Sequence, residues 1–288
     1  MRLRLFISLF IILLLTRVSY AITIGLQDDV KNSYIAVSTV GVVTDGNTGR
    51  VVMPIRAMCR YDIRSTKRGI AIKLDDGRFY NTGTNYLIIN CSNGFVSTKE
   101  KWYRGALIVK RIYDDLTVIN DLSLEEYLLG VVPSEMPSSW DEEALKAQAI
   151  AARSYALSNL GKRVSRGYDL KDTPEDQAYN GATGEKEKTT KAVLETRGKV
   201  LVYNKKVINA YYSASAGGKT RLPSQAWGTK DLPYLHSVFS YDDNVGKKGH
   251  GVGLSQYGAN NLAKQGYNAY QILNYFYNQV SLGTIKGS

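Results

Sequence analysis

The sequence predicts an α+β fold with a β-rich N-terminal part and a mixed α/β C-terminal part. Short β-branched and aromatic runs recur between residues 22 and 119, helix signals begin after Asp121, and both patterns alternate beyond residue 199. No Pro-rich or Ser-rich linker and no internal repeat divides the chain. We therefore expect a leader at residues 1–21, a β-rich region at 22–104 and a mixed domain at 105–288.

The first 21 residues have the layout of a signal peptide. Arg2 and Arg4 precede an apolar run at residues 5–15, and Ser19 and Ala21 occupy the small-residue positions of a cleavage site. The run is shorter than the ~20 residues that a membrane-spanning helix needs. We expect cleavage after Ala21, with an uncleaved N-terminal anchor as the alternative. In both cases the rest of the chain lies outside the cytoplasmic membrane, secreted or in the cell envelope, and an uncleaved anchor would be its only membrane contact.

The charge balance favours an anionic partner. The chain has 37 Lys and Arg against 26 Asp and Glu, and loss of the three arginines in residues 1–21 changes the net charge from +11 to +8. Such an excess attracts polyanions. No basic run interleaved with aromatics indicates nucleic acid, so anionic wall polymers are the expected partner. The alternative is that the lysines only keep the surface soluble.

Two cysteines, Cys59 and Cys91, lie in the N-terminal third. In an exported chain they predict a disulfide, and two buried free thiols are the alternative. Both cysteines are far in sequence from His236 and His250, without the ligand spacing of a zinc site. We expect neither a metal nor another cofactor.

The first elements in chain order are strands. Runs at residues 22–24, 70–72, 86–89 and 106–109 are rich in Ile, Val and Leu, and turn residues at 45–47 and 75–77 separate them. This spacing is typical of an antiparallel sheet.

Helices follow. Ser123 and Glu126 have the spacing of a capping box with Gly130 as a stop, and Ser139 and Glu142 have the same spacing at the start of a longer helix. The longer helix has an apolar stripe made of Leu145, Ala149, Ala152 and Ala156. Gln148 and Arg153 fall on the two flanks of this stripe, where polar groups can leave the core.

The remaining elements alternate between the two types. Residues 199–203 and 207–212 predict a hairpin across a short polar turn. Two helices then close the chain, one at 255–263 stopped by Gly266 and one at 269–277 introduced by Asn268.

Several ordered motifs resemble the SpoIID/LytB family. They are LEEYLLGVVPSEMP at residues 124–137, EALKAQA at 143–149, AAR at 151–153, DT at 172–173, Gln177, YNG at 179–181, TRG at 196–198, GGKT at 217–220 and GHGVGLSQYGA at 249–259. The resemblance runs from about residue 105 to 277, more than half of the chain, and residues 22–104 match only loosely. It implies that the mixed part is a SpoIID-like domain.

The resemblance implies a role in peptidoglycan. Family members include sporulation enzymes, lytic transglycosylases that cleave the MurNAc–GlcNAc bond of peptide-stripped glycan strands and leave 1,6-anhydroMurNAc ends. Others are non-catalytic, peptidoglycan-binding enhancers of a cell-wall amidase. Glycan strands, and in the second case an amidase, are thus the expected partners. A third hypothesis, a structural module of a wall assembly, predicts no substrate groove.

The family's catalytic acid falls on Glu135, and a transglycosylase can use this one group first as acid and then as base. Such an acid must keep its proton near neutral pH, which requires a pKa raised by burial. Met136 and Trp140 are apolar neighbours that can exclude water, whereas the N-terminus of the following helix would lower the pKa. The alternative role is a carboxylate that braces the turn before that helix.

Other polar residues are expected to bind the sugar. Gln148 and Arg153 can point into a groove, where Arg153 suits the lactyl carboxylate of muramic acid; a buried salt bridge is its alternative. The small residues around His250, Ser255, Gln256 and Tyr257 suit close approach to a ligand. We expect His250 to contact substrate or to orient Glu135. Certain family members carry zinc ligands in the segment matching residues 211–218, and this sequence has none there.

Overall fold

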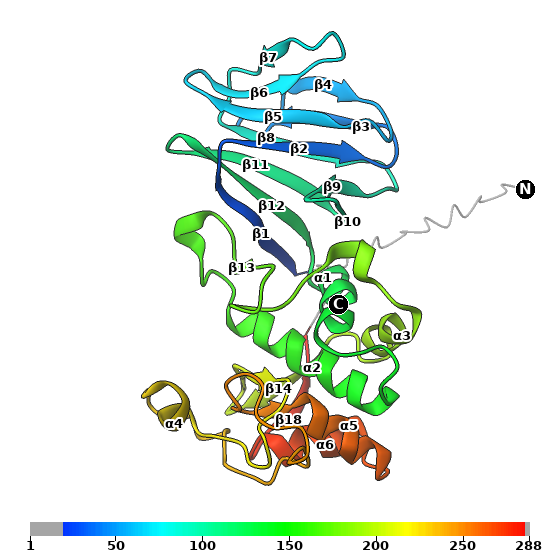
Figure 1. The fold of residues 1–288 in the computed structure, drawn as a ribbon, viewed down its shortest axis with the longest axis vertical. Coiled ribbons are helices and arrows are strands. Elements are labelled where there is room, and N and C mark those ends of the chain that lie inside the picture. The colour runs from blue at the N-terminus through cyan, green and yellow to red at the C-terminus, as the bar shows by residue number, and fades with distance from the viewer. Residues whose placement is uncertain (1–19, 286–288) are drawn as a thin grey trace, which may run out of the picture.

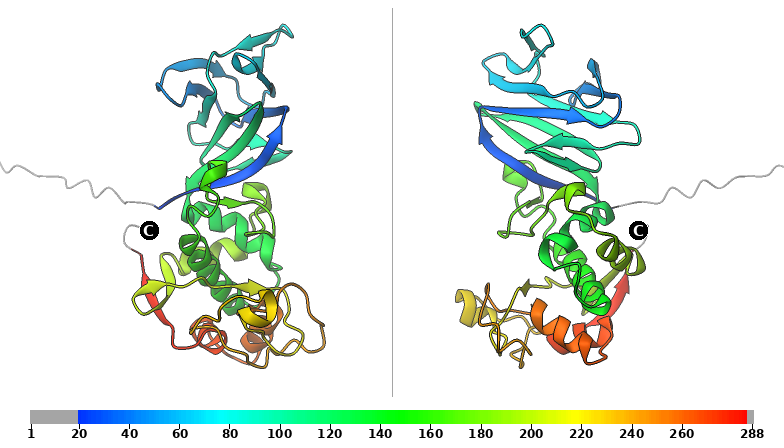
Figure 2. Two further views of the ribbon diagram at one scale, coloured as in Figure 1. Left: turned by 90° about the vertical axis from the view of Figure 1, so that its left-hand side faces the viewer. Right: turned by 45° about the vertical axis from the view of Figure 1, so that its right-hand side comes forward.

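The computed structural model describes residues 20–285, and its fold is α+β as predicted. Strands β1 to β12 fill residues 21–123 and form the upper part in Figure 1, with the helices and the remaining strands below. Figure 2 shows the two parts stacked end to end along the long axis of the molecule. Most of the predicted leader, residues 1–19, lies outside the described residues. Between residues 20 and 285 no helix combines the length and apolarity needed to span a bilayer.

The upper part consists of two sheets. The seven-stranded sheet contains, in spatial order, β13 (Leu170–Lys171), β1 (Ala21–Val30), β12 (Asp115–Ser123), β11 (Ala106–Ile112), β8 (Tyr86–Cys91), β3 (Gly41–Asp45) and β4 (Val51–Ile55). The six-stranded sheet contains β10 (Lys101–Tyr103), β9 (Val96–Thr98), β2 (Asn32–Val37), β5 (Tyr61–Thr66), β6 (Gly69–Lys73) and β7 (Phe79–Asn81). Alternating residues of both sheets, such as Val43, Leu87, Ile35 and Ile63, meet in one buried core.

The seven-stranded sheet is the link to the lower part. β11 and β12 belong to it although they lie beyond residue 105, and β12 ends at Ser123, the residue that caps the first helix. β13, from the lower part, pairs with β1 in parallel through Ile24 and Leu170. The sheet and the helical region are therefore joined at two places far apart in the sequence.

The cysteines are not bonded to each other in the structure. Both are free and half-buried; Cys91 lies at the end of β8, where its thiol donates to the Phe95 carbonyl at 3.4 Å, and Cys59 lies between β4 and β5. The expected disulfide is thus absent from the structure, and each thiol packs instead against the edge of the core.

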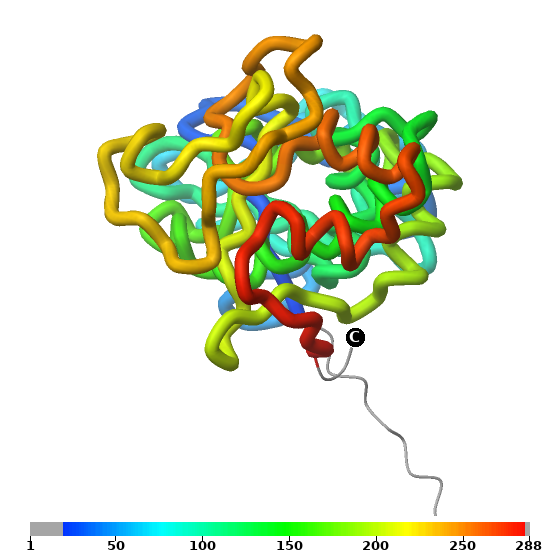
Figure 3. The backbone as a smooth tube through the Cα atoms, turned by 90° about the horizontal axis from the view of Figure 1, so that it is seen from below, coloured from blue at the N-terminus to red at the C-terminus, as the bar shows by residue number. Residues whose placement is uncertain are grey.

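The lower part is built around α2 (Glu142–Ser158), which contacts α1 (Leu124–Glu135), α3 (Glu187–Glu195), α5 (Gln256–Lys264) and α6 (Ala269–Phe276). The short elements are α4 (Pro223–Trp227) and the 3-10 helices η1 (Val164–Arg166) and η2 (Gly181–Gly184). Figure 3 shows residues 205–255 looping to one side of α5 and α6. α2 is surrounded by protein, which explains its many small apolar residues.

α1 begins as predicted but ends later. Ser123 accepts from the Glu126 N–H and the Glu126 side chain accepts from Ser123, which completes the capping box. Gly130 was a wrong stop: a Cβ there would lie 2.6 Å from the Tyr179 ring, so the glycine allows close packing instead. The helix continues through Pro133 to Glu135 and ends at Met136, where the following Pro137 disfavours helical backbone.

The other predicted helix ends are mostly confirmed. α2 is capped by Asp141, which accepts from Glu143 N at 3.0 Å, so Ser139 was the wrong cap by two positions. α6 begins after Asn268 as predicted, and α5 begins at Gln256, one residue later than predicted, because Ser255 is its cap. These caps depend on local hydrogen bonds, which is why sequence spacing identifies them.

The predicted hairpin forms only in part. β14 (Lys199–Tyr203) pairs with β15 (Lys206–Val207), and β18 (Ser281–Thr284) completes this small sheet. The chain then leaves, and β16 (Tyr212–Ser213) pairs in parallel with β17 (Leu254–Ser255). This exchange of partners places Tyr212 beside the glycine-rich segment at residues 249–259.

Candidate active site

A cleft of about 680 Å³ lies between the C-terminal end of α1, the loop before η2 and the segments at residues 211–214 and 248–256. Glu135, His250 and Gln256 all line it. The other lining residues are Ser134, Tyr155, Lys162, Pro174, Glu175, Asp176, Ala178, Tyr211, Tyr212, Ser213, Ala214, Trp227, Lys248 and Gly249. The structure therefore brings together the two segments that the sequence analysis singled out, which are more than 110 residues apart.

Glu135 is the last residue of α1 and is held from three directions. Its Oε1 accepts from the Ala178 N–H at 2.7 Å, its Oε2 accepts from Gln256 Nε2 at 3.4 Å, and the Tyr212 hydroxyl also donates to it. Because the Oε2 contact is long and the Oε1 contact is short, Oε2 is the oxygen better suited to carry a proton. The turn-bracing alternative has some basis, since Oε1 does fix the Ala178 backbone.

Burial raises the pKa of Glu135 above its ordinary value, and the hydrogen bonds from Ala178, Gln256 and Tyr212 only partly oppose it. The position of the residue adds to this effect. Glu135 lies at the C-terminal end of α1, where the partial negative charge of the helix disfavours a carboxylate. From the sequence, Glu135 was expected to feel the N-terminus of the following helix, because the predicted end of the first helix at Gly130 was too early.

A buried chain of hydrogen bonds supports the Tyr212 hydroxyl. Tyr127 donates to Gln177 Oε1 at 3.4 Å, and Gln177 Nε2 donates to the Tyr212 hydroxyl at 2.8 Å. Because its hydroxyl accepts from Gln177, Tyr212 is free to donate its proton to Glu135. Sequence reasoning did not find Tyr212 as a site residue, since it appeared only as the end of a strand.

His250 is neutral and forms part of an aromatic wall. Its Nδ1 accepts from Val252 N at 3.0 Å, and its ring centroid lies 4.9 Å from Trp227 and 6.1 Å from Tyr211. Burial lowers the pKa of His250 to about 4, although a hydrogen bond with the Tyr212 backbone acts against this. His250 therefore offers a flat surface to a ligand, and among the hydrogen bonds of the described residues none joins it to Glu135.

The other predicted residues of the glycine-rich segment have different positions. Gln256 lies in the cleft and contacts Glu135. Ser255 is buried and caps α5, so its prediction as a sugar ligand is corrected. Tyr257 is outside the cleft lining; its ring packs at 4.8 Å from Trp140, with the Lys248 ammonium 5.6 Å from its centroid.

Arg153 does not reach the cleft. It is 0% exposed and makes a two-pronged salt bridge to Glu125, with both N–O distances 2.8 Å. Its remaining N–H groups donate to the Lys199 carbonyl at 3.1 Å and the Val193 carbonyl at 3.3 Å. Substrate contact was therefore the wrong alternative and the buried salt bridge is the right one, because α2 is covered on the Arg153 side by α3 and β14.

Gln148 is also fully buried and lies outside the cleft lining, which corrects its prediction as a sugar ligand. Both polar atoms of its amide lack a hydrogen-bond partner among the described residues. It shares a face of α2 with Ala152, whose carbonyl accepts from Gln177, and with Tyr155, which lines the cleft. Gln148 thus belongs to the packing beneath the cleft.

Asp242 connects the loops that form one wall of the cleft, the C-terminal wall, made of residues 211–218, 240 and 248–256. This buried carboxylate accepts from the hydroxyls of Ser215 at 3.0 Å, Ser240 at 2.5 Å and Ser255 at 2.5 Å, and from the backbone N–H groups of Ala216 and Gly218, both at 2.7 Å. Burial alone would raise its pKa, but these hydrogen bonds outweigh it and lower the pKa. Sequence reasoning missed Asp242 because its donors come from three separate segments.

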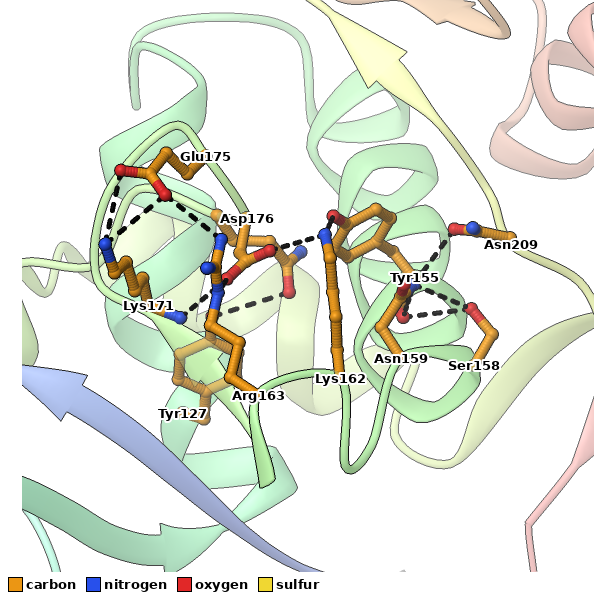
Figure 4. A network of polar contacts seen from close by, with 11 residues as sticks. Tyr127, Tyr155, Ser158, Asn159, Lys162, Arg163, Lys171, Glu175, Asp176 and Asn209 are labelled. Atoms are coloured by element: carbon orange, nitrogen blue, oxygen red, sulfur yellow. Dashed lines mark hydrogen bonds and ion pairs between the residues drawn. The ribbon is translucent and has the colours of Figure 1, made fainter. Parts of the chain in front are cut away.

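The opposite wall is held by an ion-pair network, drawn in Figure 4. The Asp176 carboxylate is buried and accepts from Lys162 Nζ at 2.6 Å, Arg163 Nε at 2.5 Å and Lys171 N at 2.8 Å. Lys162 also donates to the Tyr155 hydroxyl at 3.2 Å, as Figure 4 shows. The network fixes the loop whose Ala178 N–H binds Glu135.

No metal cluster is built into these walls. Within residues 20–285, no group of three or more His, Cys, Asp and Glu side chains is arranged to hold a metal ion. In the segment at residues 211–218, Ser215 and two backbone N–H groups donate to Asp242.

Comparisons with known proteins agree with the motifs. Residues 113–203 match the SpoIID family model, described as stage II sporulation protein. The chain is 33% identical over 185 residues to an uncharacterized protein of Brachyspira hyodysenteriae, covering 64% of this chain and 49% of the relative. It is 45% identical over 108 residues to the amidase enhancer of Bacillus subtilis, covering 38% and 14%. It is 37% identical over 145 residues to stage II sporulation protein D of the same organism, covering 45% and 42%.

The chain spans half or less of the length of these curated relatives. The matched segment contains the cleft residues Glu135 and Ala178, whereas Tyr212, His250 and Gln256 lie beyond it. The matched segment, residues 113–203, thus belongs to the SpoIID domain family, and the motifs outside it resemble the same family.

Proposed function

We propose that this protein is an exported lytic transglycosylase that cleaves the MurNAc–GlcNAc bond of peptidoglycan glycan strands. The observation that carries the proposal is the environment of Glu135, a carboxyl group with a raised pKa that lines an open cleft. Such a group keeps its proton to a higher pH than an ordinary carboxyl group does and can deliver it to a substrate oxygen. The names of the relatives, a sporulation protein and an amidase enhancer, favour a substrate in the cell wall.

In the proposed reaction, Glu135 Oε2 donates its proton to the glycosidic oxygen as the bond from that oxygen to C1 of the muramic residue breaks. The C6 hydroxyl oxygen of the same residue then bonds to C1 and closes the 1,6-anhydro ring. The Glu135 carboxylate takes the proton of that hydroxyl and returns to its starting state. No water molecule is consumed, so one carboxyl group is sufficient, unlike the carboxyl pair of most glycosidases.

The neighbours of Glu135 have matching roles in this scheme. Tyr212 and Gln256 donate hydrogen bonds to Glu135, which stabilise the carboxylate that forms after proton donation. The rings of Trp227, Tyr211 and His250 form a wall against which a sugar ring can stack.

The test is mass spectrometry of soluble products after incubating the purified protein with peptide-stripped and intact strands. Wild type is expected to release 1,6-anhydro products and Glu135→Gln is expected to release none. Glu187→Gln, an exchange at the start of α3 and outside the cleft, is the matched control and should keep full activity. Equal product from Glu135→Gln would remove Glu135 from the mechanism.

A second candidate function is non-catalytic activation of a cell-wall amidase. The 45% identity to the amidase enhancer of Bacillus subtilis favours it. In that case the cleft binds glycan without proton transfer, and both wild type and Glu135→Gln would stimulate an added amidase equally while releasing no anhydro sugar. The same product analysis therefore separates the two functions.

A further inference from the structure

A second groove lies on the outer face of the six-stranded sheet and has no part in the proposed reaction. It consists of two hollows of about 400 and 210 Å³ that share Tyr34 and Arg60, and we call it the sheet groove. The larger hollow extends to Phe79 and the smaller one to Trp102. None of the described residues that line the sheet groove also lines the cleft around Glu135.

The strand register explains why aromatic rings lie on this outer face. Side chains alternate between the two faces of a strand, and Ile35 of β2 takes the face toward the core, so its neighbours Tyr34 and Ala36 point outward. Trp102 of β10 pairs with Ser97 of β9, and Ser97 pairs with Ala36. Because Ser97 and Ala36 are small, a depression remains between Trp102 and Tyr34, and both rings line it.

The charges of the sheet groove cancel. Its charged lining residues are Arg60, Lys99, Asp62 and Glu100. Arg60 pairs with Asp62 at 3.0 Å and with Glu100 at 3.4 Å. Lys99 pairs with Asp172 at 2.7 Å. An ionic polymer would have to compete with these pairs, whereas the hydroxyl and acetamido groups of a neutral sugar can add hydrogen bonds to them, because a carboxylate oxygen accepts more than one. The sheet groove therefore suits a neutral polar ligand.

Flat groups in the sheet groove can hold a sugar ring. The Trp102 ring is half-exposed, and the Arg60 guanidinium lies 4.0 Å from the Tyr34 ring centroid. A pyranose ring has an apolar face of C–H groups and a polar rim, so it can pack on a flat group while its hydroxyls bond to side chains such as Asn32 and Asp62. The larger hollow also falls within the roughly 300–1,000 Å³ that small-molecule sites occupy.

One loop borders both the sheet groove and the cleft. At its start Asp172 binds Lys99 of the sheet groove, and at its end Thr183 Oγ1 accepts from Trp102 N at 2.9 Å. Between these two contacts the same loop lines the cleft. Figure 1 shows β9 and β10 at the edge of the upper part that faces the helices. A glycan strand is a polymer, so sugars beyond those held in the cleft extend past its rim and can reach a neighbouring surface.

We propose that the sheet groove is a second carbohydrate-binding site, which takes neutral GlcNAc units by stacking on Trp102 and by hydrogen bonds to Arg60 and Asp62. This inference rests on the proposed function in taking glycan as the ligand. It adds a contact outside the cleft, so that one strand is held at two places. The second contact raises affinity through effective concentration and takes no part in proton transfer.

The test measures binding, so that it does not depend on turnover. Titration calorimetry on the full chain, carrying Glu135→Gln to prevent cleavage, gives the dissociation constant of soluble glycan strands purified from peptidoglycan. Adding Trp102→Ala should weaken binding about tenfold, equivalent to about 1.4 kcal/mol, because a stacking surface is lost. Adding Arg60→Ala should weaken it about threefold, because hydrogen-bond donors to the sugar are lost.

Three observations separate sugar contact from damage to the fold. Trp102→Phe keeps a ring and should retain most of the affinity. The Arg60 side chain is 59% exposed, so its removal tests the sheet groove even where Trp102→Ala lowers thermal stability. Tyr113→Ala is the matched control: this aromatic is 92% exposed in the turn between β11 and β12, lines neither hollow and should leave the dissociation constant unchanged.

Unchanged affinity in both Trp102→Ala and Arg60→Ala, or an equal loss in Tyr113→Ala, would overturn the proposal. Unchanged glycan binding together with lost capture of a purified cell-wall amidase would also overturn it and make the sheet groove a protein-docking surface. Product analysis with Glu135 intact is separate. Affinity that depends on Trp102 without anhydro products would retain the second sugar site and reject the transglycosylase, and anhydro products with affinity independent of Trp102 would do the reverse.

Discussion

Replacing Arg153 by leucine tests whether this residue serves the fold or the substrate. The change removes a fully buried guanidinium with two 2.8 Å bonds to Glu125 and three bonds to backbone carbonyls. Among the described residues it leaves the buried Glu125 carboxylate with only the Gly198 N–H, at 3.2 Å. Breaking a buried pair in this way costs about 3–5 kcal/mol, because one charge remains uncompensated. We expect a loss of that size in the free energy of unfolding.

Urea denaturation followed by circular dichroism measures this loss, and two further variants define its cause. Combining Arg153→Leu with Glu125→Leu removes both charges and should recover most of the stability. Arg166→Leu breaks the exposed pair with Asp29, in which both side chains are more than half exposed, and should change the free energy of unfolding far less than Arg153→Leu does. Wild-type stability of Arg153→Leu combined with weakened glycan binding would refute the reasoning and restore Arg153 as a substrate ligand.

Three other results are expected. Glu135→Gln should stabilise the protein at neutral pH, because the pKa of Glu135 is raised by burial and stability is lost as pH rises through that pKa. Thermal unfolding at acidic and neutral pH should show a gain in stability at neutral pH only. A loss of stability at neutral pH would contradict the prediction. His250 should titrate with a pKa of about 4 in NMR spectra. Because this pKa is below that of about 6.5 for an exposed histidine, the stability of the fold should decline as pH falls from about 6.5 toward 4. A titration near 6.5 would show that the ring is not buried. Asp242→Asn should lower the free energy of unfolding by about 3 kcal/mol, because an amide cannot accept hydrogen bonds from all five donors. Backbone hydrogen exchange should become faster at residues 215–218. Unchanged exchange there would show that Asp242 does not hold this wall.

The features that the sequence could predict depend on local interactions. The caps at Ser123 and Asn268 are each a side chain bonding to a backbone group a few residues away, so spacing identifies them. Gly130 looked like a stop because its contact with Tyr179, almost fifty residues later, is not visible in the local pattern. The strands of the N-terminal part were recognisable, but not which strands pair.

The candidate site divides in the same way. Motif resemblance identified Glu135, His250 and Gln256, and the structure places all three on one cleft. A flank position on α2 could not distinguish a groove from a neighbouring helix, so Arg153 and Gln148 were assigned to the substrate although both are buried. Tyr212 and Asp242 act through partners in other segments, and single-sequence patterns carry no signal for such contacts.

The five hydrogen bonds that Asp242 accepts determine how the C-terminal wall of the cleft can move. Segments that are each held by their own contacts can loosen one at a time, but residues 215–218, Ser240 and the cap of α5 share one acceptor. Losing that acceptor would release all of them together. We therefore expect residues 215–218, Ser240 and Ser255 to loosen together as one cooperative unit and not one segment at a time.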